Sequence, residues 1–289
     1  MHPKNIHKTG YQFELLQNAI PEITSHIVIT KGGKQSINFH DPIAVKLLNR
    51  ALLKAHYKIN HWDIPEGYLC PPVPGRLDYL LGINDLLNET TKLTPKDIKG
   101  LDVGTGANMI YPLLGVSQFK WKFLASEIDE RALENGVKLL KDNKIPISKI
   151  HLKKQNNPTK IFDDIIGERD RIAFTMCNPP FYKSKEEAES ATTRKNKNLN
   201  QENLKDRNFG GLKNELWVKG GELQFIKNMM KESVKYKDQV VWFTTLVSQQ
   251  AHVSELNKTI RKLKANIRIV DMNQGQKKSR FIAWSFLLK

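Results

Sequence analysis

The tetrapeptide Asn178-Pro179-Pro180-Phe181 combines an amide side chain, two prolines and an aromatic ring directly after an apolar run. A strand that meets two prolines must leave its sheet, because proline cannot donate to the hydrogen-bond ladder. The Asn178 side chain is therefore expected at the carboxyl end of a strand, where open α/β sheets bind their ligands. Its oxygen and the Pro179 carbonyl can accept both hydrogens of an amine nitrogen, while Phe181 stacks on the planar group that contains this nitrogen. The pattern predicts a catalytic site that holds a planar amino group so that its nitrogen can act as the nucleophile.

A glycine-rich segment, residues 101–108 (LDVGTGAN), follows one predicted strand and precedes a predicted helix. Gly104 and Gly106 let the backbone turn tightly and approach a ligand closely. A dinucleotide fingerprint requires glycine or alanine where Met109 stands, so pyrophosphate binding is disfavoured. An acid two residues before the first glycine, here Asp102, is typical of S-adenosylmethionine sites. The segment is a weak signal by itself, because an ordinary strand–helix turn contains such glycines too.

Glu127 ends the next predicted strand, 23 residues after Gly104. A carboxylate at this place can accept both ribose hydroxyls of a nucleoside, although a surface acid at a strand end is the alternative interpretation. With Asn178, these residues predict transfer of a methyl group from S-adenosylmethionine to nitrogen. The sulfonium leaves as a neutral thioether, so the chemistry needs positioning more than a strong base.

These residues require an α/β fold. From Lys99 onward strands alternate with helices, which predicts a mostly parallel sheet that is covered on both faces. The expected strands are 99–103, 122–127, 149–153, 171–177, 239–246, 266–271 and 281–288. The expected helices are 41–58, 78–88, 107–115, 130–143, 221–236 and 252–264. A basic turn over 274–280 joins the last two strands as a hairpin, so an antiparallel strand ends the seven-stranded sheet.

The chain has 289 residues and a formal net charge of +16, and 39% of its residues are hydrophobic. This is enough apolar material for a core, and no run of about 18 apolar residues predicts a membrane span. Two cysteines indicate neither a disulfide framework nor a metal site, and they suit a reducing cytoplasm. The charge favours a nucleic-acid partner. A basic protein that is merely soluble, or one that binds an acidic membrane, remains an alternative.

Two units are expected along the chain. Residues 1–80 form a basic, mainly helical N-terminal RNA-binding module with a connector, of which 63–78 is rich in proline and is not expected to be helical. Residues 81–289 form the catalytic domain. Within it, 183–221 has nine Lys/Arg and six asparagines, so we expect a mobile basic loop beside Asn178. Candidate RNA contacts are Lys4, Lys8, Lys31, Lys34, Arg194, Lys195, Lys197, Lys277, Lys278 and Arg280.

Several segments resemble the bacterial 23S ribosomal RNA adenine-N6 methyltransferases (the RlmF family) and the related eukaryotic methyltransferase-like 16 group. The matching segments, which span almost the whole chain, are 2–5 (HPKN), 38–42 (NFHDP), 74–79 (PGRLDY), 102–115 (DVGTGANMIYPLLG), 176–181 (MCNPPF), 220–223 (GGEL) and 283–286 (AWSF). The resemblance implies a Rossmann-like, S-adenosylmethionine-dependent methyltransferase. Its substrate would be a specific adenine of 23S rRNA, adenine 1618 in that family.

The resemblance also implies roles for individual residues. Arg76 would reach the methionine part of the cofactor, and Gly104 with its neighbours Thr105, Gly106 and Asn108 would pass beneath it. Glu127 would hold the ribose and Asn178 the target amine. Gln155 is the candidate for the contact with the cofactor's adenine, although residues 155–159 (QNNPT) match the family poorly.

Other functions remain open at this stage. The expected partner is 23S rRNA or a large-subunit assembly intermediate. The protein is expected to be a cytoplasmic monomer that binds neither a metal nor a membrane. A protein glutamine N5-methyltransferase of the release-factor type would use the same Asn-Pro-Pro pocket, but it usually has tyrosine after the prolines. Methylation of another structured RNA, a DNA adenine methyltransferase and a non-catalytic RNA-binding protein are further alternatives.

Overall fold

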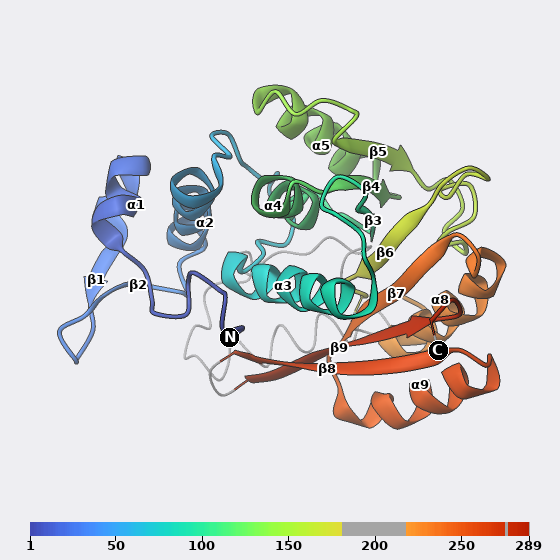
Figure 1. Cartoon of the computed structure of the whole chain (residues 1–289). Helices are drawn as coiled ribbons and strands as arrows, with labels where there is room; N and C mark the ends of the chain where they lie inside the picture. The colour runs from blue at the N-terminus through green and yellow to red at the C-terminus, as the bar shows by residue number, and fades with distance from the viewer. Residues whose placement is uncertain (181–217, 275–276, 289) are drawn as a thin grey trace.

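The computed structural model describes residues 1–180, 218–274 and 277–288 (Figure 1). Seven strands form one sheet in the order β5-β4-β3-β6-β7-β9-β8. Neighbouring strands from β5 to β7 are parallel, whereas β9 is antiparallel to both β7 and β8. The Rossmann-like α/β fold class with an antiparallel edge is therefore confirmed. The strands are β3 Lys99–Val103, β4 Lys122–Glu127, β5 Ile150–Lys154, β6 Ile172–Cys177, β7 Val240–Val247, β8 Asn266–Gln274 and β9 Lys277–Ser285.

Helices cover both faces of the sheet (Figure 1). Because side chains alternate along a strand, Phe123 and Leu124 of β4 join different hydrophobic clusters. The Phe123 cluster includes residues of the helices α2 to α5, and the Leu124 cluster includes residues of α8 and α9. The result is a three-layer arrangement, with helices α2 Pro42–Tyr57, α3 Val73–Thr90, α4 Ile110–Phe119, α5 Glu130–Asp142, α8 Gly221–Ser233 and α9 Gln250–Lys262.

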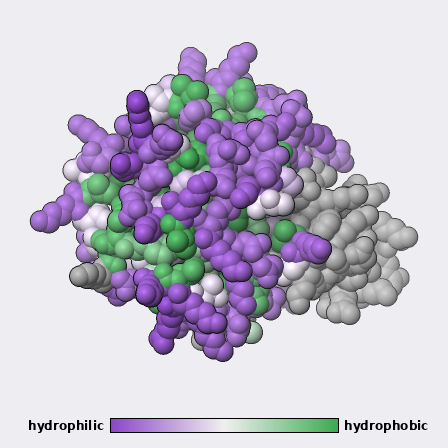
Figure 2. All heavy atoms as spheres, turned by 90° about the vertical axis from the view of Figure 1, so that its right-hand side faces the viewer, coloured by the Kyte–Doolittle hydropathy of each residue, from purple (hydrophilic) through white to green (hydrophobic). Residues whose placement is uncertain are grey.

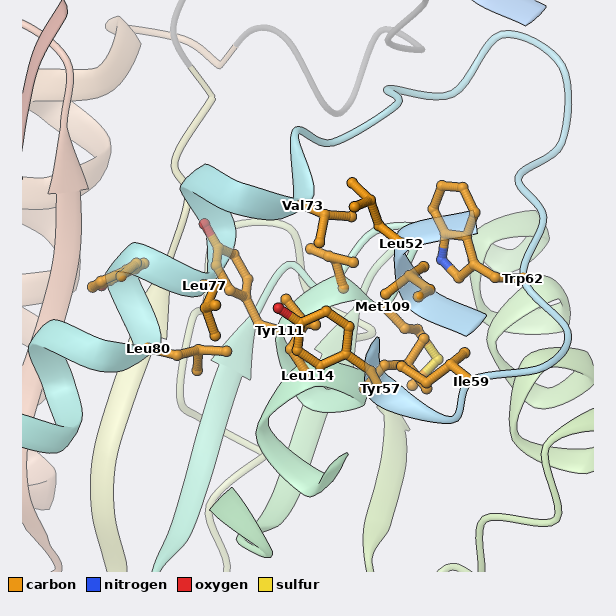
Figure 3. Close-up of a cluster of buried hydrophobic side chains, with 14 of the residues drawn as sticks. Leu52, Tyr57, Ile59, Trp62, Val73, Leu77, Leu80, Met109, Tyr111 and Leu114 are labelled. Carbon is orange, nitrogen blue, oxygen red and sulfur yellow. The ribbon is translucent and has the colours of Figure 1, made fainter. Parts of the chain in front are cut away.

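The N-terminal extension packs onto this body from one side. It contains α1 Phe13–Ala19, the 3₁₀ helix η1 Pro21–His26 and a two-stranded hairpin of β1 Ile27–Ile29 and β2 Gln35–Ile37. Its buried residues share one cluster with α2, α3 and α4, and Figure 3 draws part of this cluster, with Leu52 and Tyr57 of α2 in one group with Val73 of α3 and Leu114 of α4. The described extension therefore has no core separate from the catalytic domain, and a module boundary at residue 80 stays a prediction.

Local signals placed most helix ends well. Asp41 caps α2, since its carboxylate accepts a hydrogen bond of 2.9 Å from the Ile43 amide. The expectation that residues 63–78 are not helical is wrong for its last part, because α3 begins at Val73. Pro74 lies in the first turn, where proline costs no intrahelical hydrogen bond. The turn between the last two strands is also shorter than the predicted turn over 274–280, because β8 extends to Gln274 and β9 begins at Lys277.

The basic loop predicted over 183–221 lies outside the described residues up to 217, and residues 218–221 lead into α8. In the described part of the chain, the helices are too short or too polar to cross a membrane. Hydrophilic residues cover most of the face in Figure 2, where hydrophobic residues appear as small separate groups.

Candidate active site

A pocket lies at the carboxyl ends of β3, β4 and β6. In the sheet order, β4 lies beside β3 on one side and β7 lies beside β6 on the other, so β3 and β6 flank the topological switch point. Open α/β sheets bind ligands at this place. Val103 and Cys177 pair in register, so the backbone segments that follow β3 and β6 start side by side. The pocket walls come from within residues 69–76, 103–111, 126–128, 155–161 and 177–180, with Phe225 of α8.

The turn after β3 forms the floor of the pocket. Gly104 and Gly106 have φ angles of +67° and +64°, a region that L side chains rarely adopt. A Cβ atom on Gly104 would meet nothing within 4 Å, so its glycine is explained by backbone conformation. Asn108 lines the pocket, and its side-chain oxygen accepts a hydrogen bond from the Ile110 amide at the start of α4. Thr105 also lines the pocket, so the predicted cofactor residues of this turn are brought together.

Glu127, the last residue of β4, lies against this turn, lines the pocket and is 8% exposed. Its Oε2 atom accepts a hydrogen bond of 2.8 Å from the Gly106 amide. Its Oε1 atom accepts hydrogen bonds from the amides of Ile128 and Asp129, at 2.7 and 3.0 Å. Burial raises the pKa of Glu127, while these amides oppose the shift. Two carboxylate oxygens offer about four acceptor positions, and the three amides occupy three of them. Glu127 is therefore fixed in orientation and can still accept one hydroxyl group.

Asp102 and Arg76 are opposite charges near the floor that do not form an ion pair. Asp102 is 1% exposed, does not line the pocket, and has no hydrogen-bond partner for either carboxylate oxygen among the described residues. Burial raises its pKa to about 7 and the charge of Glu127 adds to the shift, whereas the nearby Thr105 side chain and the Arg76 charge oppose it. Arg76 does line the pocket and donates from Nη1 to the Tyr111 hydroxyl at 2.6 Å, while its buried Nε lacks a partner within the described structure. Such unpaired buried groups are costly and are typical of a ligand site.

We expect the replacement Asp102→Asn to stabilise the ligand-free protein in a pH-dependent way. With a pKa raised from 3.8 to about 7, the folded protein retains a proton that the unfolded chain releases. Through this group the free energy of unfolding falls as pH rises across that window, by up to about 1.4 kcal/mol per pH unit. The advantage of the variant over the wild type should grow up to about pH 7 and then stay constant. Urea unfolding of both proteins across the window tests this, with the exposed Asp238→Asn as the control; an advantage that is independent of pH would contradict it.

The segment after β6 supplies the other wall. All six residues of β6 are buried, and the Thr244 hydroxyl of β7 donates to the Thr175 carbonyl at 2.7 Å, which fixes the strand. Asn178 and Pro180 line the pocket, whereas Pro179 is buried behind them. Phe181 lies outside the described residues. The structure thus brings Asn178 into one pocket with Glu127, as the sequence predicted.

Gln155 lines the pocket, but its side chain is used within the protein. Its amide nitrogen donates to the Asp163 carbonyl at 2.9 Å, and its oxygen accepts from the Asn157 amide. The sequence did not single out several other lining residues. Apolar groups in the pocket lining come from Ile128, Pro158, Ile161 and Phe225, among others. Two sequence signals came near them: the candidate adenine segment 155–159 contains Pro158, and the matched segment 220–223 lies just before Phe225.

The predicted RNA contacts differ in their surroundings. Lys31 and Lys34 are exposed in the turn between β1 and β2. Lys4 instead forms an ion pair with Asp85, and the Lys8 ammonium donates to the Pro3 carbonyl. Arg280 is only 6% exposed. The predicted contacts Arg194, Lys195 and Lys197, and the side chains of Lys277 and Lys278, lie outside the described residues.

Comparisons with known proteins agree with this fold. A family model described as RNA methyltransferase, Methyltransf_10, matches residues 1–288. The ribosomal RNA large subunit methyltransferases F of Flavobacterium johnsoniae and Pseudoalteromonas translucida are 48% and 46% identical to the chain. The alignments cover 99% and 100% of this chain and 93% and 94% of those proteins.

Solved structures of human METTL16 have the same fold. Its catalytic domain in complex with MAT2A 3′UTR hairpin 1 is 31% identical, with a TM-score of 0.83 over 99% of this chain and 95% of that one. Its N-terminal domain in complex with S-adenosylhomocysteine is 28% identical, with a TM-score of 0.79 over 99% and 98%.

These matches confirm the predicted fold and the predicted relationship to the RlmF and methyltransferase-like 16 groups. S-adenosylmethionine, the cofactor predicted from the sequence, is confirmed as the cofactor of this family. The unpaired Asp102 carboxylate and the open Gly104 turn fit a cationic ligand that passes close to the backbone. The full-length match to the family model and the relatives that are 46–48% identical show that this chain belongs to the Methyltransf_10 family of RNA methyltransferases.

Proposed function

We propose that this chain methylates the N6 atom of a specific adenine in 23S ribosomal RNA, the position numbered 1618 in the RlmF family. The single observation that supports this best is Asn178, followed by two prolines, in one pocket with Glu127 and the glycine turn. The relatives named ribosomal RNA large subunit methyltransferase F support the large-subunit RNA as substrate. Action on ribosomal RNA would place the protein in the cytoplasm.

The pocket residues suit the parts of S-adenosylmethionine in order. Glu127 would accept a ribose hydroxyl, and the apolar wall of Ile128, Pro158, Ile161 and Phe225 would enclose the adenine ring. The Arg76 guanidinium would bind the methionine carboxylate. The buried Asp102 would provide negative potential beneath the cationic end of the ligand, which the unpaired state of its oxygens supports.

Asn178 would hold the target amine on the other side of the pocket. Its side-chain oxygen and the Pro179 carbonyl would accept the two amine hydrogens, which directs the nitrogen lone pair toward the cofactor. When bound, S-adenosylmethionine supplies a methyl group on a positively charged sulfur. Burial raises the pKa of the neighbouring Cys177 far above its usual value, so this thiol stays protonated and does not compete as a nucleophile. Positioning by Asn178 would therefore provide most of the acceleration.

The exposed lysines of the N-terminal hairpin are proposed RNA contacts. Lys31 and Lys34 lie in a turn that is closed by hydrogen bonds between Thr30 and Lys34, so both ammonium groups project from an ordered support. A phosphate backbone binds such cations through counterion release.

Reversal of both charges, Lys31→Glu with Lys34→Glu, should weaken RNA binding and leave cofactor binding unchanged. The slope of log affinity against log salt should become shallower by about 0.7–0.9 for each phosphate group that the variant no longer binds. The matched control reverses the charges of Lys92 and Lys96. Both are exposed and precede β3, so they lie at the end of the sheet that is opposite to the pocket. Equal effects of the two double variants in a filter-binding titration would contradict a specific role of the hairpin.

A second candidate is methylation of another structured RNA. The structural relatives solved with MAT2A 3′UTR hairpins favour it, because they share the fold over nearly the whole chain. A glutamine methyltransferase of the release-factor type has no comparable support, and this function would not explain the excess of basic residues. A non-catalytic RNA-binding protein would not need Asn178 and Glu127 in these positions.

A competition experiment separates these functions. Wild-type protein and radiolabelled S-adenosylmethionine are incubated with equal amounts of unmodified 23S rRNA, an unrelated RNA hairpin and a release-factor protein. We expect the label in 23S rRNA. Label mainly in the hairpin or in the protein would replace the proposed substrate, and absence of label with intact cofactor binding would favour the non-catalytic alternative.

A further inference from the structure

The loop after β5, residues 155–163, is fastened to helix α8 by a single carboxylate. Glu232 Oε1 accepts hydrogen bonds from the amides of Ile161, Phe162 and Asp163, at 3.1, 2.7 and 2.8 Å. Its Oε2 atom accepts a second bond from the Ile161 amide, at 3.0 Å. These amides begin a turn closed by a hydrogen bond from the Ile165 amide to the Phe162 carbonyl, so they have no partner within the turn itself.

The position of Glu232 is unfavourable for the helix alone. It is the penultimate residue of α8, where the helix dipole disfavours a negative charge. The contacts with the three amides offset this cost, which points to a role in holding the loop. Asp163 adds to the attachment from the loop side, since its carboxylate pairs with Lys235 and accepts the Tyr236 hydroxyl at 2.6 Å.

Helix α8 also supplies part of the pocket directly. Phe225 lines the pocket, and it precedes Glu232 by seven residues, so both side chains lie on one face of α8. Ile161, whose amide Glu232 binds, lines the same pocket from the loop. One face of α8 thus supplies Phe225 to the apolar wall of the pocket and holds the loop that supplies Ile161 to the same wall.

We propose that Glu232 is a positioning residue that sets the separation of Phe225 from Ile161 and thereby the affinity for the adenosine part of the cofactor. This inference rests on the proposed placement of adenine against the apolar wall. Glu232 itself does not line the pocket, so its effect passes through the loop. It should therefore change cofactor binding while turnover at saturating cofactor is preserved.

The test compares Glu232→Ala and the isosteric Glu232→Gln with the wild type in binding of S-adenosylmethionine and of 5′-methylthioadenosine, which lacks the amino-acid part. Glu232→Ala leaves three part-buried amides unpaired, and we expect the Kd of both ligands to rise about tenfold or more. Glu232→Gln keeps a neutral acceptor, so its Kd for each ligand should lie between the values of the wild type and of Glu232→Ala. Turnover at saturating cofactor should stay within about twofold of wild type.

The exposed neighbour Lys231→Ala is the matched control, and it should bind both ligands like the wild type. Wild-type Kd values in Glu232→Gln and Glu232→Ala would overturn the inference, as would lower turnover with an unchanged KM for the cofactor. If Glu232→Ala does not fold, a wild-type Kd of Glu232→Gln is sufficient to overturn it. Failure of the wild-type protein to bind 5′-methylthioadenosine would instead refute the proposed cofactor placement.

Discussion

Replacement of Asn178 by alanine is expected to reduce turnover about 100-fold or more, because it removes an acceptor that acts mainly on the target amine. The Kd for S-adenosylmethionine should stay within a few-fold of the wild type, since the proposed ribose and adenine contacts would remain. Single-turnover methylation at saturating RNA and cofactor measures the first quantity, and calorimetry measures the second.

The exposed Asn88→Ala on α3 is the matched control for this variant, and it should have wild-type turnover. More than about a tenth of wild-type turnover in Asn178→Ala would refute the proposed role of the side chain. A large loss of cofactor affinity in the same variant would move Asn178 from the substrate side to the cofactor side of the pocket.

Glu127→Ala should have the opposite effect. Hydrogen bonds to a charged group contribute about 1.5–3 kcal/mol, so the Kd for S-adenosylmethionine should rise by roughly 10- to 150-fold. The amides of Gly106, Ile128 and Asp129 would also lose their acceptor, which loosens the turn beneath the ligand.

Comparison with S-adenosylhomocysteine makes the second prediction sharper, because both ligands contain the same ribose. The two Kd values should rise by similar factors, and the exposed Glu134→Ala on α5 should change neither. Unchanged cofactor binding in Glu127→Ala would place the ribose elsewhere in the pocket.

The sequence predicted the parts of the site that depend on short-range geometry. The glycine turn and Asn178 each follow a buried strand, and Glu127 ends one. Parallel strands bring their carboxyl ends to one edge of the sheet. The N-cap of α2 at Asp41 is a local signal of the same kind.

Long-range contacts explain what the sequence could not predict. Glu232 binds the Ile161 amide across 71 positions of the chain, and no local pattern indicates which loop a helix end will contact. Lys4 stays a predicted RNA contact, and its ion pair with Asp85 of α3 is a second long-range contact that no local pattern indicates. The β1–β2 hairpin was missed because strands of three residues give almost no alternation.

The most direct test of the central claim is identification of the methylated atom. Unmodified 23S rRNA is incubated with the protein and S-adenosylmethionine, digested to nucleosides, and mapped by mass spectrometry and primer extension. We predict N6-methyladenosine at one adenine with the wild type and none with Asn178→Ala. A methyl group on another atom or base, or its incorporation by both proteins, would contradict the account.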